Sequence, residues 1–285
     1  MTHRFSKTFP LFFVLLWSTG FIGARLGLPH IEPLTFLLIR YLLVIGCMAL
    51  IAVLTRAPWP QTPQQWMHIG IAGLLVHGVY LGGVFIAISK GLPAGVASLV
   101  VGVQPLLTAV GAGWLLGETV LKRQWLGLLL GLAGVALVVA NKIGGGFGVA
   151  ALVPAIAALI GITAGTLYQK RFCPSFDWRT GAVAQFVPTA IATGLLAWWF
   201  ETGRIDWTGE LVFAMGWLVL VLSLGAVSLL NWLIRHSNAV NIASLFYLVP
   251  PCTAVFAWLL FGETFAGLAL VGMVLTVWGV YLARK

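Results

Sequence analysis

Two stretches of sequence that match each other decide the fold: QPLLTAVGAGWLLGET at residues 104–119 and VPPCTAVFAWLLFGET at residues 249–264. Each contains proline, then Thr-Ala-Val and then Gly-Glu-Thr, and the matched residue numbers all differ by 145. The same offset pairs Gly127 with Gly272, and Arg40-Tyr41 with Gln185-Phe186. Weak internal symmetry of this kind is typical of membrane proteins built from two structural repeats. We therefore expect a first repeat at residues 1–143 and a second at residues 144–285.

The composition places the chain in a membrane. Of its 285 residues 60% are hydrophobic and only 8% are charged, whereas soluble domains are about 45–50% apolar and about 25% charged. This excludes a soluble enzyme, and the abundance of apolar residues excludes a disordered chain. The net charge of +9 is scattered without a basic run, so no nucleic-acid partner is expected. The three cysteines are widely spaced, which favours neither a disulfide framework nor a zinc site.

Polar or Pro/Gly breaks separate ten apolar segments, each about as long as the 20 residues that a membrane helix needs. The alternating pattern of a membrane barrel is missing, so the sequence predicts an all-α polytopic protein with ten transmembrane helices. The predicted spans are residues 9–26, 33–54, 65–89, 95–117, 121–140, 148–170, 181–201, 210–234, 238–261 and 265–283.

The basic residues of the loops predict the orientation, because cytoplasmic loops of membrane proteins are enriched in Lys and Arg. With a cytoplasmic N-terminus, four basic residues fall outside: Arg25, Lys90, Lys142 and Arg204. Eleven then fall on the cytoplasmic side: Arg4, Lys7, Arg56, Lys122, Arg123, Lys170, Arg171, Arg179, Arg235, Arg284 and Lys285. We expect a multi-pass protein of a bacterial-type inner membrane with both termini in the cytoplasm.

The number of helices in each repeat has a mechanical consequence. Five is odd, so the second repeat enters the membrane from the opposite face and the two halves form an inverted pair. Many secondary transporters have this architecture, with the substrate site near the membrane midplane between the halves. The sequence therefore predicts a transporter of small molecules that works by alternating access, with no enzymatic activity and no cofactor or metal.

Several motifs resemble one family. The stretch Trp17-Ser18-Thr19-Gly20-Phe21, the pair Arg40-Tyr41 after Pro33, and the Gly-Glu-Thr closing two proline-containing helices resemble the EamA family of the drug/metabolite transporter superfamily. Within it, the chain is similar to YddG-type exporters of amino acids and related metabolites. The resemblance implies a basket of ten helices around a central cavity, with helices 5 and 10 peripheral, and it implies export as the direction of transport.

Arg40 is the only basic residue well inside a predicted span, and a guanidinium within the membrane is normally functional or paired. Two interpretations stay open: a gate or clamp for a substrate carboxylate, or a structural polar group. Its repeat mate Gln185 is neutral and polar, which favours a structural hydrogen bond in both copies. Glu118 and Glu263 lie at helix ends, where we expect them to cap helices or to act as gates.

The expected substrate site draws on helices of both halves. His77 and Tyr80 are three residues apart and are expected to share one face of the third helix. Prolines within spans free carbonyl groups that a cavity can satisfy, so Pro105, Pro250 and Pro251 are expected hinges. The predicted substrate-binding residues are Trp17, His77, Tyr80, Ser98, Gln104, Tyr168, Asn231, Ser244 and Tyr247.

The predicted lining is uncharged and partly aromatic, which suits small amphipathic metabolites and amino acids, aromatic ones included. Every Asp and Glu lies in a loop or at a helix end, so uniport or exchange is the simpler expectation. A lipid or lipid-linked-sugar flippase is the alternative, and an intramembrane enzyme is the alternative from a different class. Gly127, Gly131 and Gly134 have the spacing of close helix packing, which leaves both a monomer and a homodimer open.

Overall fold

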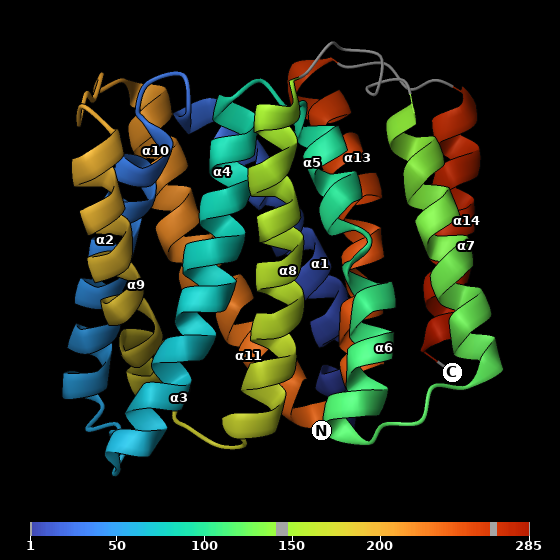
Figure 1. The fold of residues 1–285 in the computed structure, drawn as a ribbon, viewed down its shortest axis with the longest axis horizontal. Helices are drawn as coiled ribbons and strands as arrows, with labels where there is room; N and C mark the ends of the chain where they lie inside the picture. Colours follow the sequence, from blue (N-terminus) through green and yellow to red (C-terminus); the bar gives the residue numbers. More distant parts are fainter. Residues whose placement is uncertain (1, 141–147, 263–266, 285) are drawn as a thin grey trace.

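The computed structural model describes residues 2–140, 148–262 and 267–284, and in these ranges the chain consists of helices joined by short loops (Figure 1). The only extended pairing in this part is a single antiparallel bridge between Ile31 and Ile205. Three residues named in the sequence analysis, Lys142, Glu263 and Lys285, lie outside the described ranges. The prediction of an all-α polytopic membrane protein is confirmed.

The first half contains five helical rods, of which the third and fourth are divided into segments. The segments are α1 (Thr2–Gly27), α2 (Pro33–Leu54), α3 (Pro63–Gly73), η1 (Leu74–Leu81), α4 (Gly82–Ser89), α5 (Ala94–Val101), α6 (Gln104–Leu116) and α7 (Lys122–Val139). Local sequence fixes several ends. The Thr62 hydroxyl accepts a hydrogen bond from the backbone of Gln65 at the start of α3, and Gly117 ends α6 in the left-handed conformation, with φ of 67°.

The second half repeats this order. Its segments are α8 (Val149–Phe172), α9 (Trp178–Phe200), α10 (Gly209–Trp217), η3 (Leu218–Ala226), α11 (Val227–His236), α12 (Ala239–Leu245), η4 (Phe246–Leu248), α13 (Val249–Phe261) and α14 (Gly267–Ala283). The Asp177 carboxylate caps α9 and the Thr208 hydroxyl caps α10. Gly262 ends α13 with φ of 66°, as its repeat mate Gly117 ends α6.

Irregular helix geometry recurs at matching places in the two halves. The third rod of each half contains a π-helical stretch, η1 in the first and η3 in the second. The fourth rod of each half is interrupted just before a proline, so that Pro105 lies at the start of α6 and Pro250 at the start of α13. Each of these rods still forms one stretch of membrane-spanning length, in agreement with the predicted spans, and the breaks in the fourth rods lie beside the prolines expected to be hinges. They fall where a proline removes a backbone donor from the helix.

The two halves run in opposite directions. In Figure 1 the third rod of the first half rises from α3 to α4, whereas its counterpart descends from α10 to α11. The start of α1 and the end of α14 lie at the same end of the bundle, which we call the terminal face. We call the opposite end the far face. The arrangement is that of an inverted repeat.

Length and hydropathy fit a membrane-spanning bundle. Eight helices in the described part are long and apolar enough to cross a membrane, and α14 is a shorter apolar helix. Large aromatic side chains near rod ends are exposed, among them Trp114, Trp198 and Trp199. Such residues are enriched at both membrane–water interfaces.

The fifth helices of the two halves, α7 and α14, pair at one edge of the bundle (Figure 1). Glycines allow them to approach closely: a Cβ at Gly134 would lie 2.6 Å from the Gly272 carbonyl oxygen and from the Thr276 nitrogen. A Cβ at Gly127 would lie 2.6 Å from the Gly279 carbonyl oxygen. The glycine spacing noted in the sequence therefore serves contact within one chain.

Candidate functional site

A small cavity lies between the two halves. Its walls come from α1, α2 and the third rod of the first half, and from the third rod of the second half. The polar and aromatic lining residues are Trp17, Arg40, Tyr80 and the two phenylalanines Phe21 and Phe85. The volume is about 30 Å³, which is room for little more than water. The structure therefore shows a narrow cavity that has to widen before it can hold a metabolite.

Arg40 brings a buried positive charge to this cavity. Its side chain is 1% exposed, and its Nε and Nη2 donate hydrogen bonds to the Ser223 hydroxyl at 3.1 and 3.0 Å. The third nitrogen, Nη1, has no hydrogen-bond partner in the described part of the chain. No acidic side chain within the described ranges forms an ion pair with Arg40. A buried charge without a counter-ion is costly, so Arg40 is a candidate for contact with an anionic ligand.

Two aromatic residues form the wall beside Arg40. The rings of Trp17 and Tyr80 stack with their planes 10° apart and their centroids 6.3 Å apart. The indole nitrogen of Trp17 donates to the Tyr80 hydroxyl at 3.4 Å, and both side chains are almost completely buried. One cationic group and two amphipathic rings fit a ligand with a carboxylate at one end and an apolar or aromatic group at the other.

His77 does not join Tyr80 at the cavity, although the two are only three residues apart. The imidazole of His77 stacks on the Phe186 ring, with centroids 4.2 Å apart, and its backbone carbonyl accepts a hydrogen bond from the Tyr41 hydroxyl at 2.7 Å. The structure therefore brings Tyr80, and not His77, to this cavity. Both residues lie in the π-helical stretch η1, where side-chain directions differ from those of an α-helix.

Gln185 and Asn231 belong to a buried row of three amides. Gln185 Nε2 donates to Gln169 Oε1 at 3.1 Å, and Gln169 Nε2 donates to Asn231 Oδ1 at 2.8 Å. We call these three residues, all nearly inaccessible, the amide row. Both Arg40 and its repeat mate Gln185 are thus hydrogen-bonded. Gln169 was not among the residues predicted from the sequence. The only signal for it there was the presence of a glutamine inside a predicted span.

The other predicted site residues lie away from this cavity, so of the nine only Trp17 and Tyr80 form its wall. The Tyr168 hydroxyl pairs with His68 Nδ1 at 2.6 Å, and the Ser244 hydroxyl donates to the Asn241 carbonyl at 3.0 Å. Tyr247 is fully buried, and its ring is the neighbour of Gly131 on α7. Ser98 and Gln104 are buried on α5 and α6. The fourth rod of each half therefore does not contribute to this cavity.

Acidic residues hold the ends of the bundle. At the terminal face the Glu118 carboxylate accepts from the backbone nitrogen of Ala239 at 3.0 Å and lies 3.8 Å from the Lys170 ammonium. At the far face Glu201 accepts from the backbone nitrogens of Leu34 and Thr35 at 2.7 and 2.6 Å. The predicted capping position of Glu118 is where the structure places it, whereas the cap made by Glu201 was not foreseen.

Glu32 completes the far-face junction. Its carboxylate accepts hydrogen bonds from the backbone nitrogens of Thr202, Gly203 and Arg204 at 2.9, 2.8 and 3.3 Å. Burial raises the pKa of this carboxyl, but the hydrogen bonds outweigh it, so the net pKa lies below the ordinary range. Glu32 and Glu201 therefore tie the start of α2 to the end of α9 with one carboxylate from each half.

The fold is that of a polytopic membrane protein, because its helices are long enough to span a membrane. Two opposed halves with a charged cavity between them are the architecture of a transporter. The chain belongs to the EamA-like transporter family, which it matches over residues 8–140 and again over residues 149–284. The family resemblance seen in the sequence is confirmed, and the chain is a multi-pass membrane transporter.

Individual relatives cover nearly the whole chain. The uncharacterized transporter YvbV of Bacillus subtilis is 27% identical over 275 residues, which span 96% of this chain and 89% of YvbV. A Salmonella typhimurium protein named "Probable amino-acid metabolite efflux pump" is 26% identical over 283 residues, 95% of this chain and 92% of that protein. A solved crystal structure covers 96% of this chain and 94% of its own, with a TM-score of 0.80 at 23% identity. It shares the fold.

Proposed function

We propose that this protein is a secondary transporter that exports small amphipathic carboxylates, amino acids with aromatic side chains among them, by alternating access. The observation that carries the proposal is Arg40: a buried guanidinium without an acidic partner in the described ranges, on the wall of a cavity that also contains Trp17 and Tyr80. A relative named as an amino-acid metabolite efflux pump supports both the substrate class and the direction.

The chemistry of the cavity explains the choice of substrate. The guanidinium presents several donors in a plane that matches a carboxylate, and such charge-assisted hydrogen bonds are about twice as strong as neutral ones. Ser223 holds two of the donors, which fixes the direction of the third, Nη1. The rings of Trp17 and Tyr80 then contact the apolar part of the ligand. A phosphorylated substrate would call for several basic groups, and the lining contains one.

No ion has to drive the cycle. In the described ranges every acidic residue lies in a loop or at a helix end, so the spans described there offer no carboxylate as a proton or sodium relay. Uniport or exchange down the substrate gradient follows from this. The inverted halves supply the two access states, since each half can adopt the shape of the other on the opposite side of the membrane.

A flippase for lipids is the second candidate, because an apolar groove of about 460 Å³ lies on the outside of the bundle between α1, α10 and α13. Its lining residues are apolar except for Thr19, whose hydroxyl accepts from the Trp217 indole at 2.9 Å. A lipid-linked sugar would need polar groups for its headgroup, and this groove offers few. The soluble-carboxylate proposal therefore has the stronger chemical support.

Counterflow in proteoliposomes tests the proposed function. Vesicles loaded with unlabelled L-phenylalanine should accumulate labelled L-phenylalanine transiently, without any imposed ion gradient, because exchange needs only the two access states. Uptake of labelled L-threonine and movement of a fluorescent lipid across the bilayer are measured in parallel. Together the two measurements distinguish amino-acid transport from lipid flipping. Lipid movement without amino-acid counterflow would favour the flippase, and strict dependence on a proton gradient would contradict the uncoupled cycle.

We further propose that the protein lies in a bacterial-type inner membrane with its terminal face toward the cytoplasm, because basic loop residues gather at that face. A relative from Escherichia coli, 27% identical over 298 residues, is named an inner membrane transporter. An impermeant thiol reagent added to intact cells should label Arg204→Cys at the far face but not Lys122→Cys at the terminal face. The reverse pattern would contradict this orientation.

A further inference from the structure

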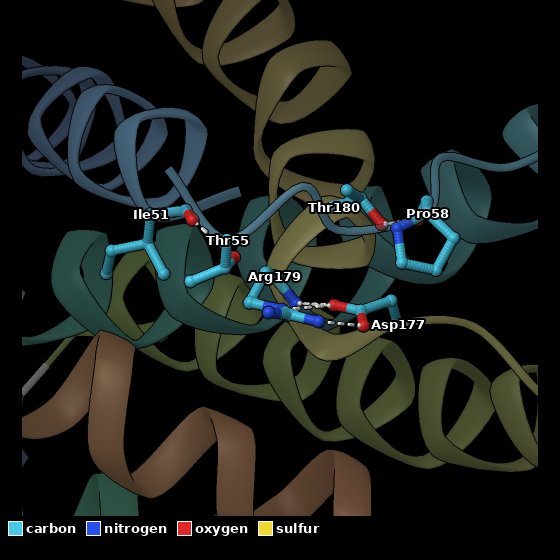
Figure 2. Close-up of polar contacts among 6 residues, drawn as sticks. All are labelled: Ile51, Thr55, Pro58, Asp177, Arg179 and Thr180. Atoms are coloured by element: carbon cyan, nitrogen blue, oxygen red, sulfur yellow. Dashed lines mark hydrogen bonds and ion pairs between the residues drawn. The ribbon is translucent and has the colours of Figure 1, made fainter. Parts of the chain in front are cut away.

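A second pocket opens at the terminal face, away from the Arg40 cavity. It has a volume of about 320 Å³ and is lined by the loop after α2, the first turns of α3, the loop after α8 and the end of α11. Hydrogen bonds hold its rim: the Thr180 hydroxyl donates to the Pro58 carbonyl at 2.7 Å, and Arg179 donates to Asp177 (Figure 2). The loops of both halves are therefore fastened around one opening.

Arg235 is the cationic group of this pocket. Its Nε and Nη2 are buried and have no hydrogen-bond partner in the described part of the chain. The guanidinium carbon lies 4.1 Å from the centroid of the Phe176 ring, a cation–π contact that holds the group in place without neutralising it.

The acidic residue of the same pocket is already paired. The Asp177 carboxylate accepts from Arg179 Nε at 2.9 Å and from Arg179 Nη2 at 2.7 Å. Within the described ranges Arg235 has no ion-pair partner of its own. The pocket therefore combines the Arg235 guanidinium, which lies in the field of Asp177 but makes no hydrogen bond through Nε or Nη2, with neutral polar groups, Gln61, Gln65 and Ser175, and with the indole of Trp59.

One helical rod connects this pocket to the Arg40 cavity. Arg235, Asn231, Val227 and Ser223 follow one another at four-residue spacing along the third rod of the second half. Val227 lines the Arg40 cavity and Ser223 binds Arg40, whereas Arg235 lines the outer pocket. Along α11 the rise from Val227 to Arg235, eight residues further on, is about 12 Å. Asn231, between the two ends, is held by Gln169 of the amide row.

We propose that the Arg235 pocket is a second binding station, which takes up the carboxylate of a small aromatic or apolar metabolite before it reaches Arg40. The amide row is the barrier between the two stations and has to separate for the ligand to pass. This inference rests on the proposed transport function. It adds the location of the site at which a ligand first binds on the terminal face. A single guanidinium beside aromatic rings and a paired Asp177 suits a monocarboxylate or an amino acid and disfavours a polyanion.

Equilibrium binding of tritiated L-phenylalanine to the purified protein tests the second station. Arg40→Gln disables the inner site and should leave a residual, weaker binding. Arg235→Gln, added to that variant, should weaken the residual binding about 10- to 100-fold, because a charge-assisted hydrogen bond is lost. Arg171→Gln, which removes an exposed arginine from the last turn of α8 at the same face, should change nothing. Complete loss of binding in Arg40→Gln alone, or residual binding indifferent to Arg235→Gln, would overturn the proposal.

A second variant keeps the test independent of how Arg235→Gln folds. Gln61→Glu places a negative charge on the exposed rim of the pocket. It should weaken competition by 3-phenylpropionate and leave competition by phenethylamine, which has no carboxylate, unchanged or stronger. Equal effects on both competitors would overturn the proposal.

Flux measurements separate this proposal from the proposed function. Arg235→Gln should raise the half-saturating concentration of L-phenylalanine for flux that starts from the terminal face, and should leave the maximal flux nearly unchanged. Normal half-saturation in Arg235→Gln, with normal wild-type flux, would refute the second station alone. Absence of flux in the wild type would refute the proposed function itself.

Discussion

Replacing Arg40 by glutamine should abolish tight substrate binding without destabilising the protein. Removing a charge from the membrane interior gains about 2.5–3.5 kcal/mol on the insertion scale. Losing the hydrogen bonds to Ser223, at 3.1 and 3.0 Å, costs about 1.5–3 kcal/mol. The two nearly cancel, so the free energy of unfolding should stay the same or rise by up to about 2 kcal/mol. Loss of the contact to a substrate carboxylate, about 1.5–3 kcal/mol, should weaken binding about 10- to 100-fold.

The assay compares thermal unfolding of the purified variant with the half-saturating concentration of L-phenylalanine flux. Arg123→Gln, which removes an exposed arginine at the start of α7, is the matched control and should change neither. A purely structural Arg40 would give the opposite result. If Arg40→Gln lost about 3 kcal/mol or more of stability and the folded fraction still transported normally, the reasoning would be refuted.

Three further predictions follow from contacts in the structure. Tyr80→Ala should raise the half-saturating concentration about tenfold because it removes a ring from the cavity wall, whereas His77→Ala should mainly lower thermal stability, because its ring stacks on another ring 4.2 Å away. Gly134→Val should lower the free energy of unfolding by about 1–3 kcal/mol or more, measured by denaturation, because its Cβ would meet α14 backbone at 2.6 Å. The hydrogen bonds from Arg179 hold the pKa of Asp177 below its ordinary range, so their stabilisation is present above the unfolded pKa and is lost as pH falls through the lower folded pKa. Asp177→Asn should remove that part of the pH dependence of the melting temperature, and an unchanged profile would contradict it.

Much of the fold was readable in the sequence. The offset that relates the two Gly-Glu-Thr stretches predicted two similar halves, and the odd helix number predicted their opposite directions. The length of apolar segments located the rods, because hydrocarbon thickness fixes how long a spanning helix has to be. The π-helical stretches η1 and η3 could not be predicted in this way, since both are apolar nearly all round and have no hydrophobic period that an extra residue could interrupt.

The site was predictable only in part. Arg40 stood out because a charge inside a span is rare, and Trp17 and Tyr80 because their rings carry polar groups. Which face of each rod turns inward depends on packing between rods far apart in the sequence, so Tyr168 and Tyr247 were placed with Trp17 although they lie elsewhere. Gln169 and Arg235 become informative only when their neighbours are known, since both acquire their roles from other rods.

The central claim is that Arg40 binds the carboxylate of the transported molecule, and competition for counterflow tests it most directly. In wild-type proteoliposomes 3-phenylpropionate should compete with labelled L-phenylalanine, whereas phenethylamine, which keeps the ring and the amine but has no carboxylate, should not. In Arg40→Gln the advantage of 3-phenylpropionate should shrink to the weaker preference that the Arg235 pocket provides. Equal competition by the acid and the amine in the wild type, or an undiminished preference for the acid in Arg40→Gln, would contradict the account.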